Sequence, residues 1–222
     1  LMPYPEWLAM RLRRRSDLHP LPTNPAPLSL ITTVYEGTNI ELLDRLAESV
    51  MAQTAKPSQW VIVAHGPIAE ENLRYLVEEF AEKWQATVIV EPRRLGIMGA
   101  MRRGLENADG EYIVPVDADD LLTKDAIQIL SSTLARLNNP DLLFSDEDVL
   151  VEGMPTAPYF RSAFDPVLNL DSSYIWHLCA IKREKAVAVG LYTDYAATWC
   201  HDWDTIMRIV SAGGRVEHVP EV

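Results

Sequence analysis

The sequence predicts an α/β fold in which a mostly parallel central sheet is flanked by helices. Apolar runs rich in β-branched residues alternate with stretches whose apolar positions recur at helical spacing. Strands that alternate with helices need crossover connections, which make the strands parallel and place helices on both faces of the sheet. The 222 residues suffice for one large domain, and no internal repeat divides them.

Each element can be justified in chain order. Apolar runs predict strands at Leu28–Val34, Trp60–Ala64, Thr87–Val90, Tyr112–Val116 and Leu142–Phe144. Helical periodicity predicts helices over Asn39–Thr54, Glu70–Trp84, Gly96–Ala108 and Thr123–Leu137. After residue 150 the alternation weakens, and Gly153–Leu170, with three prolines, is expected to be irregular. Beyond it we expect helices over 183–190 and 199–212 and a final strand at Arg215–Val219.

The charge of the chain is strongly uneven. The net charge is −12, and residues 106–152 alone hold 12 acidic and two basic residues. Binding to nucleic acid needs a concentrated basic surface, so the sequence predicts no nucleic-acid partner. Hydrophobic residues make up 48% of the chain, as is typical of globular proteins, and this excludes intrinsic disorder as the main organisation.

Cysteine usage and the N-terminal segment bear on location. Two cysteines, Cys179 and Cys200, favour a reducing, cytoplasmic compartment, and no apolar run is long enough for a signal peptide or a membrane span. Residues 20–27 hold four prolines and predict an extended linker. Before them, Trp7 and Leu8 precede Arg11, Arg13, Arg14 and Arg15. A solvated helix end is the favoured interpretation of these arginines, and peripheral contact with the inner face of the plasma membrane is the alternative. The start at Leu1 leads us to expect part of a larger chain.

Acidic residues follow two predicted strands. Asp117, Asp119 and Asp120 come after one strand, and Asp146, Glu147 and Asp148 after another. Ligands of open parallel sheets bind outside the carboxyl ends of the strands, so these acids indicate a cation or polyol ligand. An Asp-x-Asp pair suits Mg²⁺ or Mn²⁺, which would hold a pyrophosphate. A solvated turn that caps the next helix is the alternative. The chain has no GxGxxG, P-loop, GxSxG or HExxH motif.

The residues then resemble a known family. Leu105–Asp120 strongly resembles the core of the family 2 glycosyltransferases, and Leu30–Gln53, Gly96-Ile97 and Ala100 extend the match. Further blocks resemble the rhamnosyltransferase-like branch that builds bacterial surface polysaccharides: Ser145–Asp148, Pro158–Phe160, Asp165-Pro166, Tyr174–Leu178, His201–Asp204 and His218–Pro220. The resemblance covers residues 28–222.

The resemblance implies a GT-A-type fold and an inverting transfer of a hexosyl or deoxyhexosyl group. The donor would be a nucleoside diphosphate sugar, and the acceptor a hydroxyl of a glycan or lipid-linked glycan. Residues 1–27 would form a lead-in, 28–150 the nucleotide-sugar-binding half and 151–222 the acceptor-side half, truncated at its C-terminus.

The resemblance also implies roles for individual residues. Asp202 would be the catalytic base, with a helix N-cap or a partner of Arg208 as its alternatives. Asp117, Asp119 and His218 would bind the Mn²⁺ or Mg²⁺ ion. The donor would be contacted by Thr33, Tyr35, Glu36, His65, Gly96, Arg102 and Asp117. The acceptor side would hold Asp146, Glu147, Trp176 and His177, where Trp176 would stack on a sugar ring or pack in the core.

The chain departs from the family pattern at specific positions. Ala64-His65 stands where the family has an Asp pair that contacts the nucleotide base, and Arg102 stands in place of an Asn. Arg102 would pair with the diphosphate or lie on a solvated face. These departures leave a non-catalytic scaffold or binding module of a larger protein as the alternative function. A phospho-accepting signalling domain is a third possibility, which the region 153–170 argues against.

Overall fold

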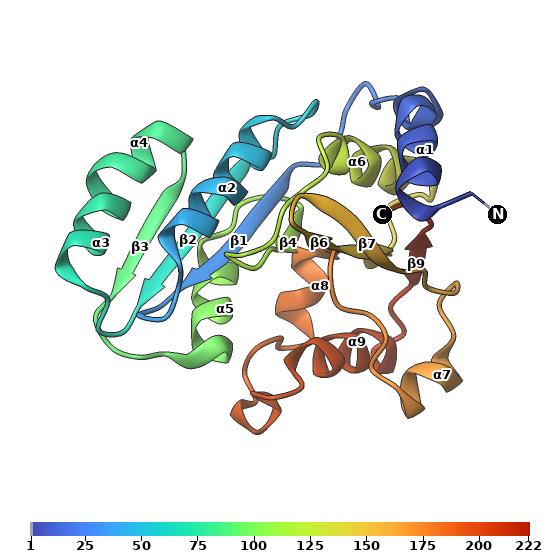
Figure 1. Ribbon diagram of the computed structural model, residues 1–222. Helices are drawn as coiled ribbons and strands as arrows, with labels where there is room; N and C mark the ends of the chain where they lie inside the picture. The colour runs from blue at the N-terminus through green and yellow to red at the C-terminus, as the bar shows by residue number, and fades with distance from the viewer. Residues whose placement is uncertain (1) are drawn as a thin grey trace.

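A seven-stranded sheet forms the centre of the computed structural model, which describes residues 2–222 (Figure 1). The strand order is β3-β2-β1-β4-β8-β5-β9, and every strand is parallel to the rest except β8. The strands are β1 (Leu28–Val34), β2 (Gln59–His65), β3 (Thr87–Glu91), β4 (Tyr112–Pro115), β5 (Leu142–Ser145), β8 (Cys179–Lys182) and β9 (Val216–Val219). The predicted α/β class with a mostly parallel sheet is confirmed.

Helices cover both faces of this sheet. The helices of the described chain are α1 (Tyr4–Leu18), α2 (Ile40–Met51), α3 (Glu70–Arg74), α4 (Ala81–Trp84), α5 (Gly96–Asn107), α6 (Ala126–Arg136), α7 (Pro166–Asp171), α8 (Arg183–Ala188) and α9 (His201–Ser211), with a 3-10 turn at Tyr195–Ala197. A π-helical stretch, Tyr75–Phe80, joins α3 to α4, so the helix predicted over Glu70–Trp84 is a continuous helical run.

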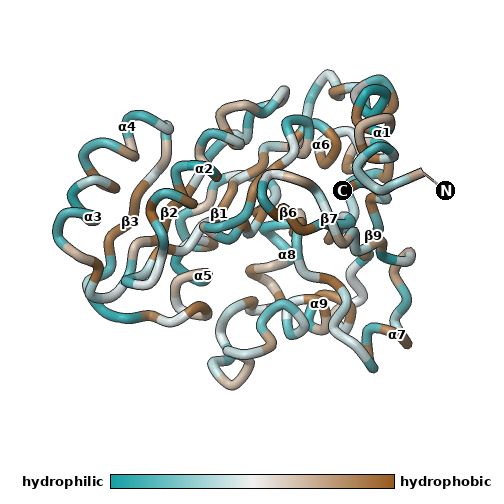
Figure 2. The backbone as a smooth tube through the Cα atoms, in the orientation of Figure 1, coloured by the Kyte–Doolittle hydropathy of each residue, from teal (hydrophilic) through white to brown (hydrophobic). Residues whose placement is uncertain are grey.

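The two faces of the sheet carry two large, separate hydrophobic cores, and Val61, Val63 and Ala100 form a third, small cluster. Along β1, Leu30 packs on the face covered by α2 and α6, whereas its neighbour Ile31 packs on the face covered by α5 and α9. Successive strand residues point to opposite faces, so a strand buried on both sides needs a continuous apolar run. Figure 2 shows this as hydrophobic colour along the central strands, in contrast to the hydrophilic outer turns of α3 and α4.

Helix α2 illustrates how the sequence forms these layers. The side chain of Asn39 accepts a hydrogen bond from the backbone N–H of Glu41, which caps the first turn. Leu43, Leu46, Ala47 and Val50 recur at helical spacing and are buried against the sheet. Full burial of a leucine side chain stabilises the fold by about 2 kcal/mol.

The expectation that residues 153–170 are irregular is wrong. Strands β6 (Glu147–Val151) and β7 (Met154–Tyr159) form an antiparallel hairpin, and α7 follows. Glu152 and Gly153 both have positive φ angles, 51° and 78°, as a two-residue hairpin loop requires. The prolines fit because this ribbon is a separate two-stranded sheet and has free edges.

Strand β8 was also missed by the sequence prediction. It consists of four residues and lies antiparallel between β4 and β5. The two strands that precede the acidic groups are therefore not neighbours, although they are parallel and end at the same edge of the sheet.

Helix α1 packs on β7, and two of its arginines are paired with acids. Arg15 is fully buried and forms an ion pair with Asp125, while Arg11 pairs with Glu221 at 2.7 Å. The expectation of a solvated helix end is therefore wrong for Arg15 and Arg11 and holds for the exposed Arg13 and Arg14. Within residues 2–222, no helix has the length and hydropathy needed to cross a bilayer.

Candidate active site

A tight turn directly after β4 brings two carboxylates together. The backbone N–H of Asp120 donates to the C=O of Asp117 at 3.2 Å, so the chain reverses over four residues. The first and fourth residues of such a turn are close neighbours. This geometry groups Asp117 with Asp120, whereas the sequence pattern had paired Asp117 with Asp119.

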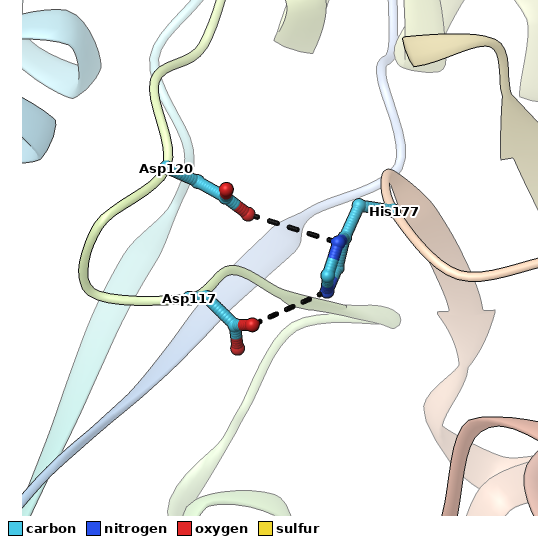
Figure 3. A group of neighbouring side chains, drawn as sticks. All are labelled: Asp117, Asp120 and His177. Atoms are coloured by element: carbon cyan, nitrogen blue, oxygen red, sulfur yellow. Dashed lines mark ion pairs between the residues drawn. The ribbon is translucent and has the colours of Figure 1, made fainter. Parts of the chain in front are cut away.

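His177, in the segment before β8, completes a group of three possible metal ligands (Figure 3). Its Nε2 lies 3.5 Å from Oδ2 of Asp117, and its Nδ1 lies 3.9 Å from Oδ2 of Asp120. One ligand atom from each residue falls within 4.8 Å of the others. About half of the Asp117 side chain remains exposed, so an incoming ligand has access to the group. His177 had been predicted for the acceptor side, and its place beside the acids was not foreseen.

The carboxylates of this group are electrostatically crowded. Desolvation by burial raises the pKa of Asp117, and the charges of Asp119 and Asp202 raise it further, while His177 opposes the shift. Desolvation likewise raises the pKa of Asp120, again against His177. A positive charge bound near Asp117 and Asp120 would stabilise their ionised forms, because it reduces the repulsion among the carboxylates.

Asp202 lies in the first turn of α9, close enough to act on Asp117 electrostatically. Its Oδ1 is 3.4 Å from Nε2 of His201, and 42% of its side chain is exposed. Arg208 pairs with Asp204 at 2.7 Å, and Cys200 occupies the position before the helix. Both alternatives for Asp202, a partner of Arg208 or a helix N-cap, are therefore wrong.

Four of the residues predicted to contact the donor, Thr33, Tyr35, Glu36 and His65, lie at or just after the ends of β1 and β2. Tyr35, just after β1, stacks on His65, the last residue of β2, with ring centres 6.4 Å apart. His65 is buried, and its Nδ1 accepts a hydrogen bond from the backbone N–H of Leu95. Burial lowers the pKa of His65. The ring contact with Tyr35 and the hydrogen bond from Leu95 together hold the His65 imidazole in place between the ends of β1 and β2.

The loops around these strand ends add further polar groups. Glu36 forms an ion pair with Arg94, a residue that the sequence analysis did not single out although it lies just before Gly96. Gly96 begins α5 with a φ of 66°, a conformation that favours glycine. Thr33 is half-buried near the end of β1. Arg102 pairs with Glu106 at 3.0 Å on the exposed face of α5, which matches its solvated alternative.

His218 lies in a different place from the group that it was predicted to complete. Its Nε2 is 2.7 Å from Oδ1 of Asp146, and its ring stacks on Phe144. His218 and Asp146 are paired in the protein interior. Of the two histidines, His177 and not His218 contacts Asp117.

Glu147 and Trp176, the other residues predicted for the acceptor side, are neighbours in sequence of Asp146 and His177. Both flank Arg161, whose guanidinium is 3.0 Å from Oε1 of Glu147 and 5.8 Å from the ring centre of Trp176. Trp176 stacks on Tyr159 and keeps 39% of its surface exposed, so it is not a core tryptophan. A cavity of about 140 Å³ opens nearby, and its lining includes Asp120, Asp146, Glu147, His177 and Leu178.

Comparison with known proteins gives a family match for this chain. Residues 29–168 match the family described as Glycosyl transferase family 2. The O-antigen biosynthesis protein RfbC of Myxococcus xanthus is 27% identical over 230 residues, which cover all of this chain and 18% of RfbC. The amylovoran biosynthesis glycosyltransferase AmsE of Erwinia amylovora is 21% identical over 87% of this chain and 73% of its own length.

Solved structures share the fold. Crystal structures of Staphylococcus aureus TarS superpose with a TM-score of 0.68 at 16% identity, over 88% of this chain and 35% of TarS. TarS 1–349 in complex with UDP gives the same TM-score at 18% identity, and 58% of that chain is covered. The present chain thus spans only a part of RfbC and of TarS.

Proposed function

The chain belongs to glycosyl transferase family 2, and on this basis we propose that it transfers a sugar from a nucleoside diphosphate donor to a glycan hydroxyl, with inversion. The names of RfbC and AmsE support a surface polysaccharide as the product. The structure of TarS with UDP-GlcNAc supports a uridine nucleotide in the donor. The observation that carries the proposal is the Asp117–Asp120–His177 group with Asp202 beside it.

The donor set of this group fits a divalent cation. Two carboxylate oxygens suit Mg²⁺ and Mn²⁺ alike, and the imidazole nitrogen favours Mn²⁺ because Mg²⁺ prefers oxygen ligands. Asp117, Asp120 and His177 would hold the ion, and Asp119, exposed on the same turn, remains available to the donor. When bound, the ion would neutralise charge on the diphosphate.

Asp202 would act as the general base. The acceptor hydroxyl gives its proton to the carboxylate as its oxygen attacks the anomeric carbon, and the bond from that carbon to the diphosphate oxygen breaks. Attack from the side opposite the leaving group inverts the anomeric centre. An exposed carboxylate at the start of α9 meets the requirement that the base be reachable by substrate.

Seven further predicted residues would line the two substrate-binding surfaces. Tyr35 and His65 would flank the nucleotide base, with Thr33, Glu36 and Gly96 around them, whereas Glu147 and Trp176 would flank the acceptor. A lipid-linked acceptor would place the enzyme at the cytoplasmic face of the membrane, where the exposed Arg13 and Arg14 would meet anionic lipid headgroups.

A thermal-shift experiment tests this proposal. UDP with Mn²⁺ should raise the melting temperature more than either alone, and Asp117→Ala should abolish the increment. Release of UDP from UDP-GlcNAc, by hydrolysis or transfer, should depend on Mn²⁺ and on Asp202. A folded protein that responds to no nucleoside diphosphate with Mn²⁺ would contradict the proposal and favour the non-catalytic module.

A further inference from the structure

Arg161 is a buried cation at the junction of segments that surround the candidate site. Its side chain has no exposed surface, and it lies between β7 and α7. Burial of a charge costs several kcal/mol unless the group is paired and hydrogen-bonded. The partners of the guanidinium therefore identify the chain segments that Arg161 connects.

The partners of Arg161 come from two segments that are far apart in the sequence, residues 145–147 and the segment before β8. Its Nε donates to the C=O of Tyr174 at 2.7 Å, and its Nη1 donates to the C=O of Ser145 at 2.8 Å. Its Nη2 lies 3.0 Å from Oε1 of Glu147, in an ion pair without the angles of a hydrogen bond. The backbone N–H of Arg161 donates to Asp146 at 2.8 Å. One residue thus links the end of β5, the start of β6 and the segment before β8.

The same guanidinium lies close to a pair of aromatic rings. Its central carbon is 4.8 Å from the ring centre of Tyr159 and 5.8 Å from that of Trp176. The two rings stack with centres 5.6 Å apart and planes 13° from parallel. Cation–π contacts of this kind favour one orientation of the rings. Trp176 is followed directly by His177, so its orientation constrains where that imidazole can point.

We propose that Arg161 is the positioning residue of this site. Its planar fork fixes Glu147 and the segment from Tyr174 to His177 relative to each other, and thereby sets the place of His177 beside Asp117. The consequence for catalysis rests on the proposed function, while the positioning itself does not. A lysine cannot replace the fork, because its three donors radiate from one nitrogen and cannot reach two carbonyls and a carboxylate in one plane.

Substitution of Arg161 with a histidine-specific readout tests the positioning role. We would label the histidines with ¹⁵N and assign the ring resonances of His177 by comparison with His177→Gln. In Arg161→Lys, which keeps the charge, these resonances should shift or split into several conformers. The dissociation constant for Mn²⁺ should rise by about tenfold, as when a group that orients a metal ligand is lost.

Arg183→Lys is the matched control. Arg183 also holds a backbone carbonyl, that of Gly110, at 2.8 Å, but at the opposite edge of the sheet. The substitution should lower the melting temperature without moving the His177 resonances. Arg161→Lys with His177 resonances and Mn²⁺ affinity equal to those of the unchanged protein would overturn the proposal.

A second variant tests the positioning role independently of Arg161→Lys. If Arg161→Lys does not fold, Glu147→Gln removes the ion pair at its partly exposed end, and unchanged His177 resonances in that variant would overturn the proposal. If the unchanged protein binds neither Mn²⁺ nor UDP, the proposed function fails. The metal-free histidine spectra would still show whether Arg161 positions His177.

Discussion

The Nε2 atom of His177 lies 3.5 Å from Oδ2 of Asp117, although the two residues are on different connections of the sheet. Neither residue is a convincing ligand alone, since acidic turns and half-exposed histidines are both common. Their contact turns a short acidic motif into a three-ligand group, and the first prediction follows from it.

His177→Gln should weaken Mn²⁺ binding by tenfold or more, on the order of 1.4 kcal/mol, because the group loses one of its three ligands. The dissociation constant can be measured from the EPR signal of free Mn²⁺. His218→Gln is the comparison variant, and it should leave the affinity within twofold because His218 pairs with Asp146. A larger loss of Mn²⁺ affinity in His218→Gln than in His177→Gln would instead support the ligand set predicted from the sequence, which includes His218.

Asp202→Asn should lower kcat for sugar transfer by roughly 10²–10⁴-fold, the usual contribution of a general base. The melting temperature should change little, because the Asp202 side chain is partly exposed and Arg208 pairs elsewhere. Asp204→Asn, two positions away, is the control: it breaks the ion pair with Arg208 and should cost only about 0.3–0.5 kcal/mol of stability. Equal losses of kcat in Asp202→Asn and Asp204→Asn would contradict the assignment of Asp202 as the general base.

The buried His65 should make the fold sensitive to mild acid. Because burial lowers the pKa of His65 in the folded protein, the unfolded chain binds a proton first as the pH falls. The free energy of unfolding should therefore decrease from about pH 6.5 downward, by at most about 1.4 kcal/mol per pH unit from this group. Urea unfolding of the unchanged protein and of His65→Gln at several pH values measures the difference, and parallel pH profiles would contradict it.

Arg15→Met should reduce the free energy of unfolding by about 3–5 kcal/mol, because it leaves the buried carboxylate of Asp125 without its partner. Arg13→Met, on the exposed side of the same helix, should change stability by less than about 0.5 kcal/mol. Denaturant titration distinguishes the two. Similar effects would mean that α1 contributes through helix propensity and not through its ion pair.

The sequence could predict most of the sheet because local patterns determine it. The bounds of β1 coincide with the predicted strand, since a strand covered on both faces has an unbroken apolar run. β8 was missed because it runs antiparallel between two parallel strands, outside the alternation of strands and helices, and the β6–β7 hairpin was missed because its prolines argued against strands. Gly153 was the available signal for the hairpin, because glycine readily adopts the positive φ angle that this turn position requires.

The candidate site was predictable where it is local. Asp117 was singled out as a candidate because it follows a predicted strand, whereas Asp202 was singled out from the family resemblance. The choice of Asp120 over Asp119 depends on how the turn closes, and the partners of His177 and Arg161 depend on tertiary contacts. The uneven charge pointed to residues 106–152, which hold Asp117 and Asp120, yet it could not reveal that Arg15, far upstream in the sequence, pairs with Asp125 in the same stretch.

The reversed direction of β8 has a consequence for how such a site is assembled. In a purely parallel sheet, only segments that leave a strand reach the ligand edge. Because β8 runs the opposite way, the edge also receives a segment that enters a strand, and His177 arrives on it two residues before Cys179. The site is therefore built both from a segment that leaves a strand and from a segment that enters one. The register of β8 against β4 determines how far His177 extends toward Asp117. A one-residue deletion between His177 and Cys179 would draw the imidazole away from Asp117 while leaving every residue of the acidic turn in place.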